Sequence, residues 1–218
     1  MSAEKIRIGC ASGFWGDTST AAKQLVEKAS LDYLVFDFLA EVTMSILSKA
    51  KLKNPKLGYA TDFIDQITPL LKEIKDKKIK VITNAGGINP HSCKTALKTE
   101  AEKFGLKLNI ATVEGDNILT ELPALKKQDI REIEKKSLLP EVCLSINAYL
   151  GAPGIVEALT NGADIVITGR VVDSALVLGP LMYEYNWKYS DYDQLSASAA
   201  KSGGAAGGKA HSGQGASE

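Results

Sequence analysis

The stretch Gly162-Ala163-Asp164-Ile165-Val166-Ile167-Thr168-Gly169-Arg170-Val171-Val172-Asp173 contains the pattern that decides the fold. A short β-branched run ends in a polar turn, and apolar residues at helical spacing follow. The pattern recurs along the chain, with strands predicted at Ile6–Cys10, Tyr33–Phe38, Lys80–Thr83, Lys107–Val113, Leu144–Asn147 and Ile165–Thr168. Strands that alternate with helices indicate a parallel sheet.

We therefore expect an α/β domain of three layers, with a mostly parallel, Rossmann-like sheet of about six strands. A partial β/α barrel is the structural alternative, and its active face would be formed by the same strand ends. The carboxyl ends of parallel strands meet at one edge of a sheet, where ligands bind. The turns that follow the strands are therefore predicted to form one site.

The predicted helices carry two internal breaks. Apolar residues recur at steps of three and four from Ile64 to Ile74, and Pro69 either kinks this helix or marks its start. The segment Asp116–Lys136 is predicted to be helical with interruptions, because Pro123 breaks it. Further helices are expected at Pro90–Phe104 and Leu176–Tyr185.

Composition narrows the class of protein. The 218 residues suffice for one sizeable domain, and 44% hydrophobic and 24% charged residues are ordinary for a globular protein. The net charge of zero does not suggest a nucleic-acid-binding surface.

There is no membrane-spanning apolar run, signal region or transit pattern, so we expect a cytoplasmic protein. Cys10, Cys93 and Cys143 form no C-x-x-C motif, which fits a reduced compartment. The two histidines cannot form a histidine-based metal cluster without carboxylate ligands.

The composition changes after Leu195. Residues 196–218 are rich in Ala, Gly, Ser and Lys without a large apolar side chain, so we expect a domain over residues 1–195 and a disordered tail over 196–218. Within the tail, Gly203–Lys209 matches the G-x-x-x-x-G-K phosphate-binding spacing. However, Ala210 replaces the Ser or Thr that would bind magnesium, so we interpret the match as a coincidence of composition.

The first turn is the sharpest candidate for ligand binding. Backbone amides at Ser12, Gly13 and Gly16 lie between a strand and a helix, where they could hold a phosphate or a carboxylate. Asp37 ends the second strand, where dinucleotide-binding folds place a ribose-binding acid. Asp17 would repel a pyrophosphate, and it could instead cap the helix or serve in proton transfer.

Two later turns carry further candidates. Gly86 and Gly87 allow positive φ and close approach to a ligand, and Asn89 starts a helix. Glu114 and Asp116 are paired carboxylates that could share acid–base work or hold a hard cation. The alternative for each turn is a purely structural role.

The last two turns contribute the remaining ligand-binding candidates, which are Asn147, Thr168, Gly169, Arg170 and Asp173. Arg170 could bind a carboxylate or a phosphate through two parallel hydrogen bonds. It could also pair with Asp173 across one helical turn. Cys10 borders the first turn, and we interpret it as a small buried apolar residue rather than a nucleophile.

Four blocks resemble the N-terminal domain of the acyclic terpene utilisation protein A (AtuA-like) family. They are Ile8-Gly9-Cys10-Ala11-Ser12-Gly13-Phe14-Trp15-Gly16-Asp17, Asp32-Tyr33-Leu34-Val35-Phe36-Asp37-Phe38-Leu39-Ala40-Glu41, Asn84-Ala85-Gly86-Gly87-Ile88-Asn89-Pro90 and Gly162-Ala163-Asp164-Ile165-Val166-Ile167-Thr168-Gly169-Arg170. The resemblance runs from about Lys5 to Leu195 and implies a link to the breakdown of acyclic terpenes and related branched acyl-CoA compounds. Some family members are fused or adjacent to acyl-CoA carboxylase parts. Family members also continue past the position of Leu195 with further domain sequence, so we expect a truncated domain.

Two functional hypotheses follow. The first is an enzyme of branched acyl-CoA catabolism, in which Arg170 and the amides of the first turn hold an anionic group and Asp17, Glu114 or Asp116 transfers protons. The second is a non-catalytic module or inactive relic that binds a partner, such as a second copy or an acyl-CoA carboxylase component. Neither hypothesis names a cofactor or a reaction.

Overall fold

The structure is a computed structural model of the chain, and it describes residues 5–198. Its strands form one open sheet in the order β1-β2-β3-β5-β4, and all neighbouring strands are parallel. Their bounds are β1 Ile8–Ser12, β2 Tyr33–Phe36, β3 Lys80–Thr83, β4 Ile110–Val113 and β5 Ile165–Thr168. The predicted α/β class with a parallel sheet is confirmed, with five strands instead of about six.

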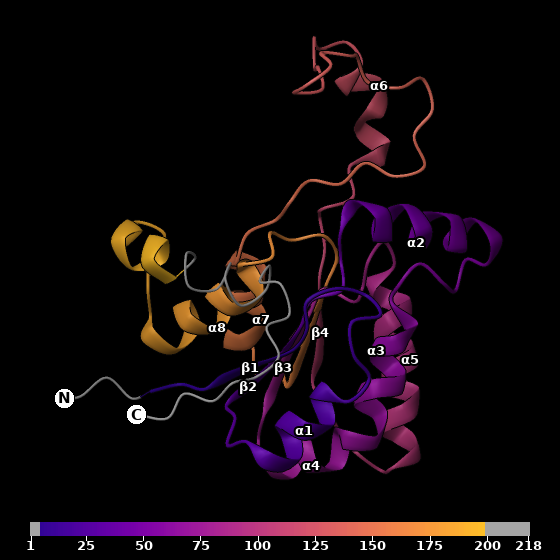
Figure 1. Ribbon diagram of the computed structural model, residues 1–218. Coiled ribbons are helices and arrows are strands. Elements are labelled where there is room, and N and C mark those ends of the chain that lie inside the picture. The colour runs from indigo at the N-terminus through magenta and orange to yellow at the C-terminus, as the bar shows by residue number, and fades with distance from the viewer. Residues whose placement is uncertain (1–4, 199–218) are drawn as a thin grey trace.

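Helices cover both faces of the sheet (Figure 1). The first face carries α1 (Ala21–Lys28), α2 (Glu41–Lys53), α3 (Thr61–Ile67), α4 (Leu71–Asp76) and α5 (Pro90–Lys103). The second face carries α7 (Pro153–Thr160) and α8 (Ala175–Tyr185). The fold therefore has the three expected layers.

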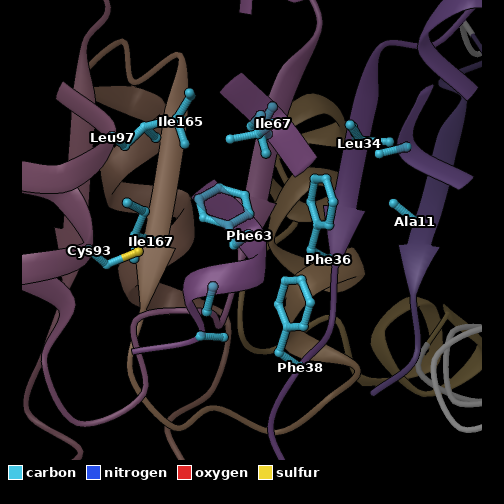
Figure 2. Packing of buried hydrophobic residues seen from close by; sticks show 14 of the residues in the cluster. Ala11, Leu34, Phe36, Phe38, Phe63, Ile67, Cys93, Leu97, Ile165 and Ile167 are labelled. Carbon is cyan, nitrogen blue, oxygen red and sulfur yellow. The ribbon is translucent and has the colours of Figure 1, made fainter. Parts of the chain in front are cut away.

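Strand β2 is buried along its whole length because both faces of the sheet are covered. Successive side chains point to opposite faces, so Leu34 and Phe36 join the core of the first face, whereas Tyr33 and Val35 join that of the second. Figure 2 shows Phe36 beside Phe63 of α3, and their ring centroids lie 5.2 Å apart in an edge-on arrangement. The continuous apolar run in the sequence is thus explained by burial on two sides.

The break predicted at Pro69 is present. Helix α3 ends at Ile67, a 3-10 turn spans Thr68–Leu70, and α4 follows. Proline has no backbone N–H, so it interrupts the helical hydrogen bonds although the apolar stripe of side chains continues.

The predicted strand Leu144–Asn147 is not a strand of the sheet. Ile118 N donates to Ile146 O (2.8 Å), and Asn147 forms an isolated antiparallel bridge with Asn117. These contacts close the neck of a long excursion, residues 117–147, which we call the arm. The residues Leu144–Asn147 are prone to form a strand, but their pairing with residues 117 and 118 across the neck holds them away from the sheet.

Helical structure in the arm is limited to a 3-10 turn at Leu119–Glu121 and to α6, Leu122–Leu125. The helix predicted over Asp116–Lys136 is therefore wrong beyond these two short pieces. The arm rises from the sheet beyond α2 (Figure 1) and contributes no residue to either buried core cluster. Without a surface to pack on, an isolated helix of this length is marginal in water.

Several boundaries differ from those expected. Strand β1 spans Ile8–Ser12 instead of Ile6–Cys10, and β2 ends at Phe36 instead of Phe38. Strand β4 begins at Ile110 instead of Lys107, and residues 192–198 are helical, which extends helical structure past Leu195. The rest of the expected tail, including Gly203–Lys209, lies outside the described residues. Within residues 5–198, no helix is both long and apolar enough to cross a membrane.

Candidate functional site at the carboxyl edge of the sheet

The all-parallel pairing brings the turns after the strands to one edge, as predicted. The turn at residues 147–151 follows no strand, but it reaches the same edge. Leu150 bridges to Val171, and Ala148 N donates to Asp116 O at 2.7 Å. Convergence at this edge is therefore confirmed for all six turns.

The three predicted acid–base residues do not share one site. Asp17 follows β1 and Glu114 follows β4, at opposite ends of the sheet, so four strand spacings or about 19 Å separate the two strands. Asp17 Oδ2 accepts a hydrogen bond from Gly13 N (2.9 Å), and Glu114 pairs with His91 Nε2 (3.0 Å). Neither carboxylate can act on an atom that the other contacts.

The sheet has a topological switch at its centre. The helices that follow β1, β2 and β3 pack on the first face, whereas α8, which follows β5, packs on the second. Because β3 and β5 are neighbours, their connections leave in opposite directions. Open α/β sheets bind ligands outside such a position. Asn84 directly follows β3, and Arg170 lies two residues after the end of β5.

Arg170 is the central side chain at this position, and it is almost fully buried. Its Nη1 donates to Val171 O (2.9 Å) and Asp173 Oδ1 (3.0 Å), and its Cζ lies 4.0 Å from the centre of the Tyr149 ring. Glu41 Oε1 lies 3.9 Å from Nη2 and accepts a hydrogen bond from Tyr149 Oη. Burial opposes the charge, but Tyr149 and Asp173 raise the pKa of Arg170.

One donor of Arg170 is unused. Within residues 5–198, its buried Nε has no hydrogen-bond partner. A buried unpaired donor of a charged group carries a desolvation penalty, and native structures rarely leave one without a reason. Tyr149 and Glu41, both exposed, lie over the guanidinium as its cover.

Asp37 is the second buried charged residue at the centre of the edge. Its Oδ1 accepts a hydrogen bond from Asn84 Nδ2 (2.6 Å), and Asn84 Oδ1 in turn accepts one from Phe38 N (2.7 Å). Burial raises the pKa of Asp37 to about 6, and the charge of Asp173 acts in the same direction. The Asn84 hydrogen bond and the charge of Arg170 oppose the shift. Asp37 can therefore exchange a proton near neutral pH.

Asp116 holds the base of the arm to the end of β5. Its Oδ2 accepts hydrogen bonds from Asn147 Nδ2 and from Arg170 N, both at 2.8 Å. A Cβ on Gly169 would lie 2.3 Å from Asp116 Oδ1, so glycine is needed for this approach. Asp116 thus positions the segment that carries Arg170, and Asn147 and Gly169 serve the same contact.

Gly86 and Gly87, which precede α5, lie close to other atoms of the protein instead of bordering open space. A Cβ on Gly86 would lie 2.5 Å from Thr168 O, and one on Gly87, which has a φ of +55°, would lie 2.4 Å from Leu47 Cδ1. Asn89 caps α5 through Ser92 N (3.4 Å). These contacts correspond to the structural alternative for this turn.

Three remaining candidates have local partners or open surroundings. Ser12 Oγ donates to Asp37 O (3.2 Å), and Thr168 Oγ1 donates to Gly169 O (2.8 Å). Gly16 has a φ of +90° and nothing near its would-be Cβ. Burial raises the pKa of the Cys10 thiol, which suits a packed side chain better than a nucleophile.

Sequence reasoning did not single out Glu41, Asn84 and Tyr149, although each lies in or beside a predicted turn. Asn84 directly follows a strand, which was the available signal. The contacts of Glu41 with Arg170 and with Tyr149 join residues more than a hundred positions apart, and the contact of Tyr149 with Arg170 joins two different turns. Among the described residues, no group of three or more His, Cys, Asp and Glu side chains could hold a metal ion.

Comparisons with known proteins place this architecture in a family. The sequence profile of the acyclic terpene utilisation family protein AtuA matches residues 6–203. No curated protein matches the chain, and no solved structure matches it. The profile match covers most of the chain, and the chain therefore belongs to the acyclic terpene utilisation protein AtuA family.

Proposed function

We propose that this chain is an enzyme of acyclic terpene and branched acyl-CoA catabolism, and that it performs proton transfer beside Arg170. Family membership implies involvement in acyclic terpene utilisation. The observation that supports a catalytic role is the buried Arg170 with its unpaired Nε, located at the topological switch of the sheet.

The proposed chemistry acts on an acyl thioester. The carboxylate of Asp37 takes a proton from the carbon next to the thioester carbonyl. The C–H electron pair forms a C=C bond to the carbonyl carbon, and the C=O π pair moves onto the carbonyl oxygen to give an enolate, which takes the proton back on carbon in the reverse step. Arg170 Nε–H donates to that oxygen as negative charge develops on it. A pKa of about 6 lets Asp37 accept and return the proton near neutral pH.

The residues first expected to serve this chemistry have secondary roles in the proposal. Asp17 occupies Gly13 N, so that amide can hold an anionic group only if the carboxylate releases it. Asp116 already accepts two hydrogen bonds and positions Arg170, and Glu114 lies at the far end of the edge. Tyr149 and Glu41 must move aside to admit a substrate, because they cover the guanidinium.

A second candidate function is a non-catalytic accessory module that binds an acyl-CoA carboxylase component. The observation that favours it is the mutual pairing of the polar side chains at the edge, such as Asn84 with Asp37 and His91 with Glu114. Side chains that satisfy one another leave fewer groups for a substrate.

Deuterium exchange separates the two functions. Isovaleryl-CoA, a branched acyl-CoA, is incubated with the full chain in D2O, and deuterium next to the carbonyl is followed by mass spectrometry. The enzyme reading expects exchange that Asp37→Asn abolishes and that Arg170→Lys reduces. Arg131→Lys, which alters an exposed arginine of the arm, is the matched control and should exchange like the unaltered chain.

Thermal shift with the same ligand and with CoA alone completes the test. A ligand that binds only the native state raises the melting temperature. Stabilisation without exchange would support the accessory module against the enzyme. If the ligand produces no stabilisation and no deuterium exchange, the acyl-CoA proposal is contradicted.

A further inference from the structure

We propose that the arm segment Val142–Ile146 of one copy adds as a strand to the open edge of β4 in a second copy, and that the exchange is reciprocal. The inference rests on a β-prone segment that lies outside the sheet and on an unpaired sheet edge among the described residues of the same chain. It is independent of the proposed catalytic chemistry.

The arm exposes several large hydrophobic side chains. Five of its large hydrophobic side chains are exposed, and they are Ile130, Ile133, Leu138, Val142 and Leu144. Its five basic and five acidic residues balance, which suits a protein partner better than a nucleic acid or an anionic membrane. A projection with no net charge and with exposed hydrophobic side chains favours a protein contact.

Strand β4 offers the matching backbone. Its inner side pairs with β5, where Asn109 O and Val113 O accept hydrogen bonds. Because alternate residues point to opposite sides, the backbone groups of Ile110 and Thr112 face the outer edge. No strand among residues 5–198 pairs with that edge. Open edges of this kind recruit strands from other chains.

Two hollows of about 400 Å³ each flank β4, one on each face of the sheet. The hollow beside α5 is lined by the apolar side chains of Ala101, Leu106, Leu108 and Ile110. The hollow beside α7 is lined by polar residues that include Asn109, Glu157 and Asn161. The two sides of an added strand would therefore meet different surroundings.

The segment has the corresponding alternation. Val142, Leu144 and Ile146 fall on one side of an extended strand, whereas Cys143 and Ser145 fall on the other. The apolar side suits the hollow beside α5, and the small polar side suits the hollow beside α7. A one-residue slip would reverse both matches, so the pattern specifies the register.

Charge selects the direction of the added strand. Glu141 precedes the segment, and the apolar hollow is bordered by Lys98 and Lys107. Parallel pairing places Glu141 at the amino end of β4, beside Lys107. Glu141 now pairs with Lys126 across an exposed part of the arm (2.7 Å), a contact that contributes little to stability.

The neck of the arm favours a second copy over the segment's own sheet edge. Pairing with its own β4 would break the Ile118–Ile146 and Ala148–Asp116 backbone hydrogen bonds and draw Asn147 away from Asp116. Exchange between copies leaves those contacts at the root of the arm in place, and two equivalent contacts close a two-fold dimer.

Sedimentation velocity of the full chain tests the proposal. The expected mass is twice the 23.3 kDa of one copy. Leu144→Lys should raise the dimer dissociation constant at least about tenfold. Ile133→Lys places the same charge on an exposed arm residue outside the segment, and it should leave the dimer intact.

A second pair of variants tests the edge of β4. Thr112→Pro removes one backbone N–H that faces outward and leaves the side that pairs with β5 unaltered. Thr112→Val keeps this N–H and is the control. Only the proline variant should dissociate. If it fails to fold, the Leu144→Lys and Ile133→Lys pair decides alone. If the unaltered chain is monomeric, the proposal is overturned. Slow amide exchange at Thr112 in such a monomer would not rescue it, because the strand that covers the edge would then come from the same copy. A dimer unaffected by Leu144→Lys would overturn it too.

Discussion

At the residue scale, the fold raises the pKa of the Asp37 carboxyl group toward neutral pH. Its folded pKa of about 6 exceeds its ordinary value of 3.8. Between these values the native state binds more protons than the unfolded chain, so the free energy of unfolding falls as pH rises from about 4 to about 6. Above this range, the Asn84 hydrogen bond, a backbone hydrogen bond at Leu39 and the charge of Arg170 partly offset the burial of the charged carboxylate.

We predict that Asp37→Asn removes this part of the pH dependence. Relative to the variant, the unaltered chain should lose about 2 kcal/mol of unfolding free energy between pH 4 and pH 7. Urea denaturation at several pH values measures the difference. Asp173→Asn removes a charge that raises the pKa of Asp37, so it should shrink the loss. Equal slopes for Asp37→Asn and the unaltered chain would contradict the assignment.

Gly169 is the second informative residue, because it lets Asp116 reach the end of β5. In Gly169→Ala, the new Cβ would lie 2.3 Å from Asp116 Oδ1 and would displace a carboxylate that accepts two hydrogen bonds. We expect a loss of about 1–3 kcal/mol in thermal or urea unfolding. Gly151→Ala is the matched control, since its nearest neighbour would be Pro153 Cδ at 3.3 Å. Comparable losses in both variants would argue against the Asp116 contact.

At the element scale, Asn89 connects helix α5 to a loop. Its Oδ1 caps the helix, and its Nδ2 donates to Pro55 O (2.9 Å) and Leu57 O (2.7 Å). One side chain therefore fixes both the start of α5 and the loop that follows α2. The sequence signal, Asn followed by Pro at the first helical position, captured only the first role.

Two substitutions separate these roles. Asn89→Ala removes the cap and both loop contacts and should cost about 1–3 kcal/mol. Asn89→Asp keeps an acceptor for the cap but loses the two donors, so it isolates the loop contribution. Chemical denaturation ranks the two variants. An Asn89→Asp variant as stable as the unaltered chain would show that the loop contacts contribute nothing.

At the scale of the whole molecule, the last strand is inserted between two earlier ones. Strand β5 pairs with β3 on one side and with β4 on the other. The arm lies between β4 and β5 in the chain but outside the packed layers (Figure 1). A cut in the arm would therefore separate the chain into two pieces that remain joined through the sheet.

Limited trypsin digestion should show this arrangement. We predict early cleavage in the arm after Lys135 or Lys136, both exposed, and co-elution of the resulting pieces in gel filtration without denaturant. Lysines between α4 and β3, such as Lys78, follow a packed helix and should be cut later. Pieces that separate without denaturant would contradict the inserted position of β5.

Local patterns determined the elements that the sheet buries on both faces. The apolar run at Tyr33–Phe36, the proline break at Pro69 and the capped start at Pro90 were readable because their causes lie within a few residues. The gathering of the turns at one edge followed from parallel strands alone. The family could also be identified from four sequence blocks, since together they are specific.

Only the tertiary structure decided which candidates meet. Strand order separates Asp17 from Glu114 and brings Asp37 close to Arg170, and order depends on long-range packing rather than on local preference. The segment Leu144–Asn147 has the alternation of a strand, but Asp116 and the neck of the arm hold it off the sheet. The sequence determined the layers and their common edge, because burial and backbone preference act locally. The centre of the site depended on contacts such as Tyr149 over Arg170, which exist only after the chain has folded.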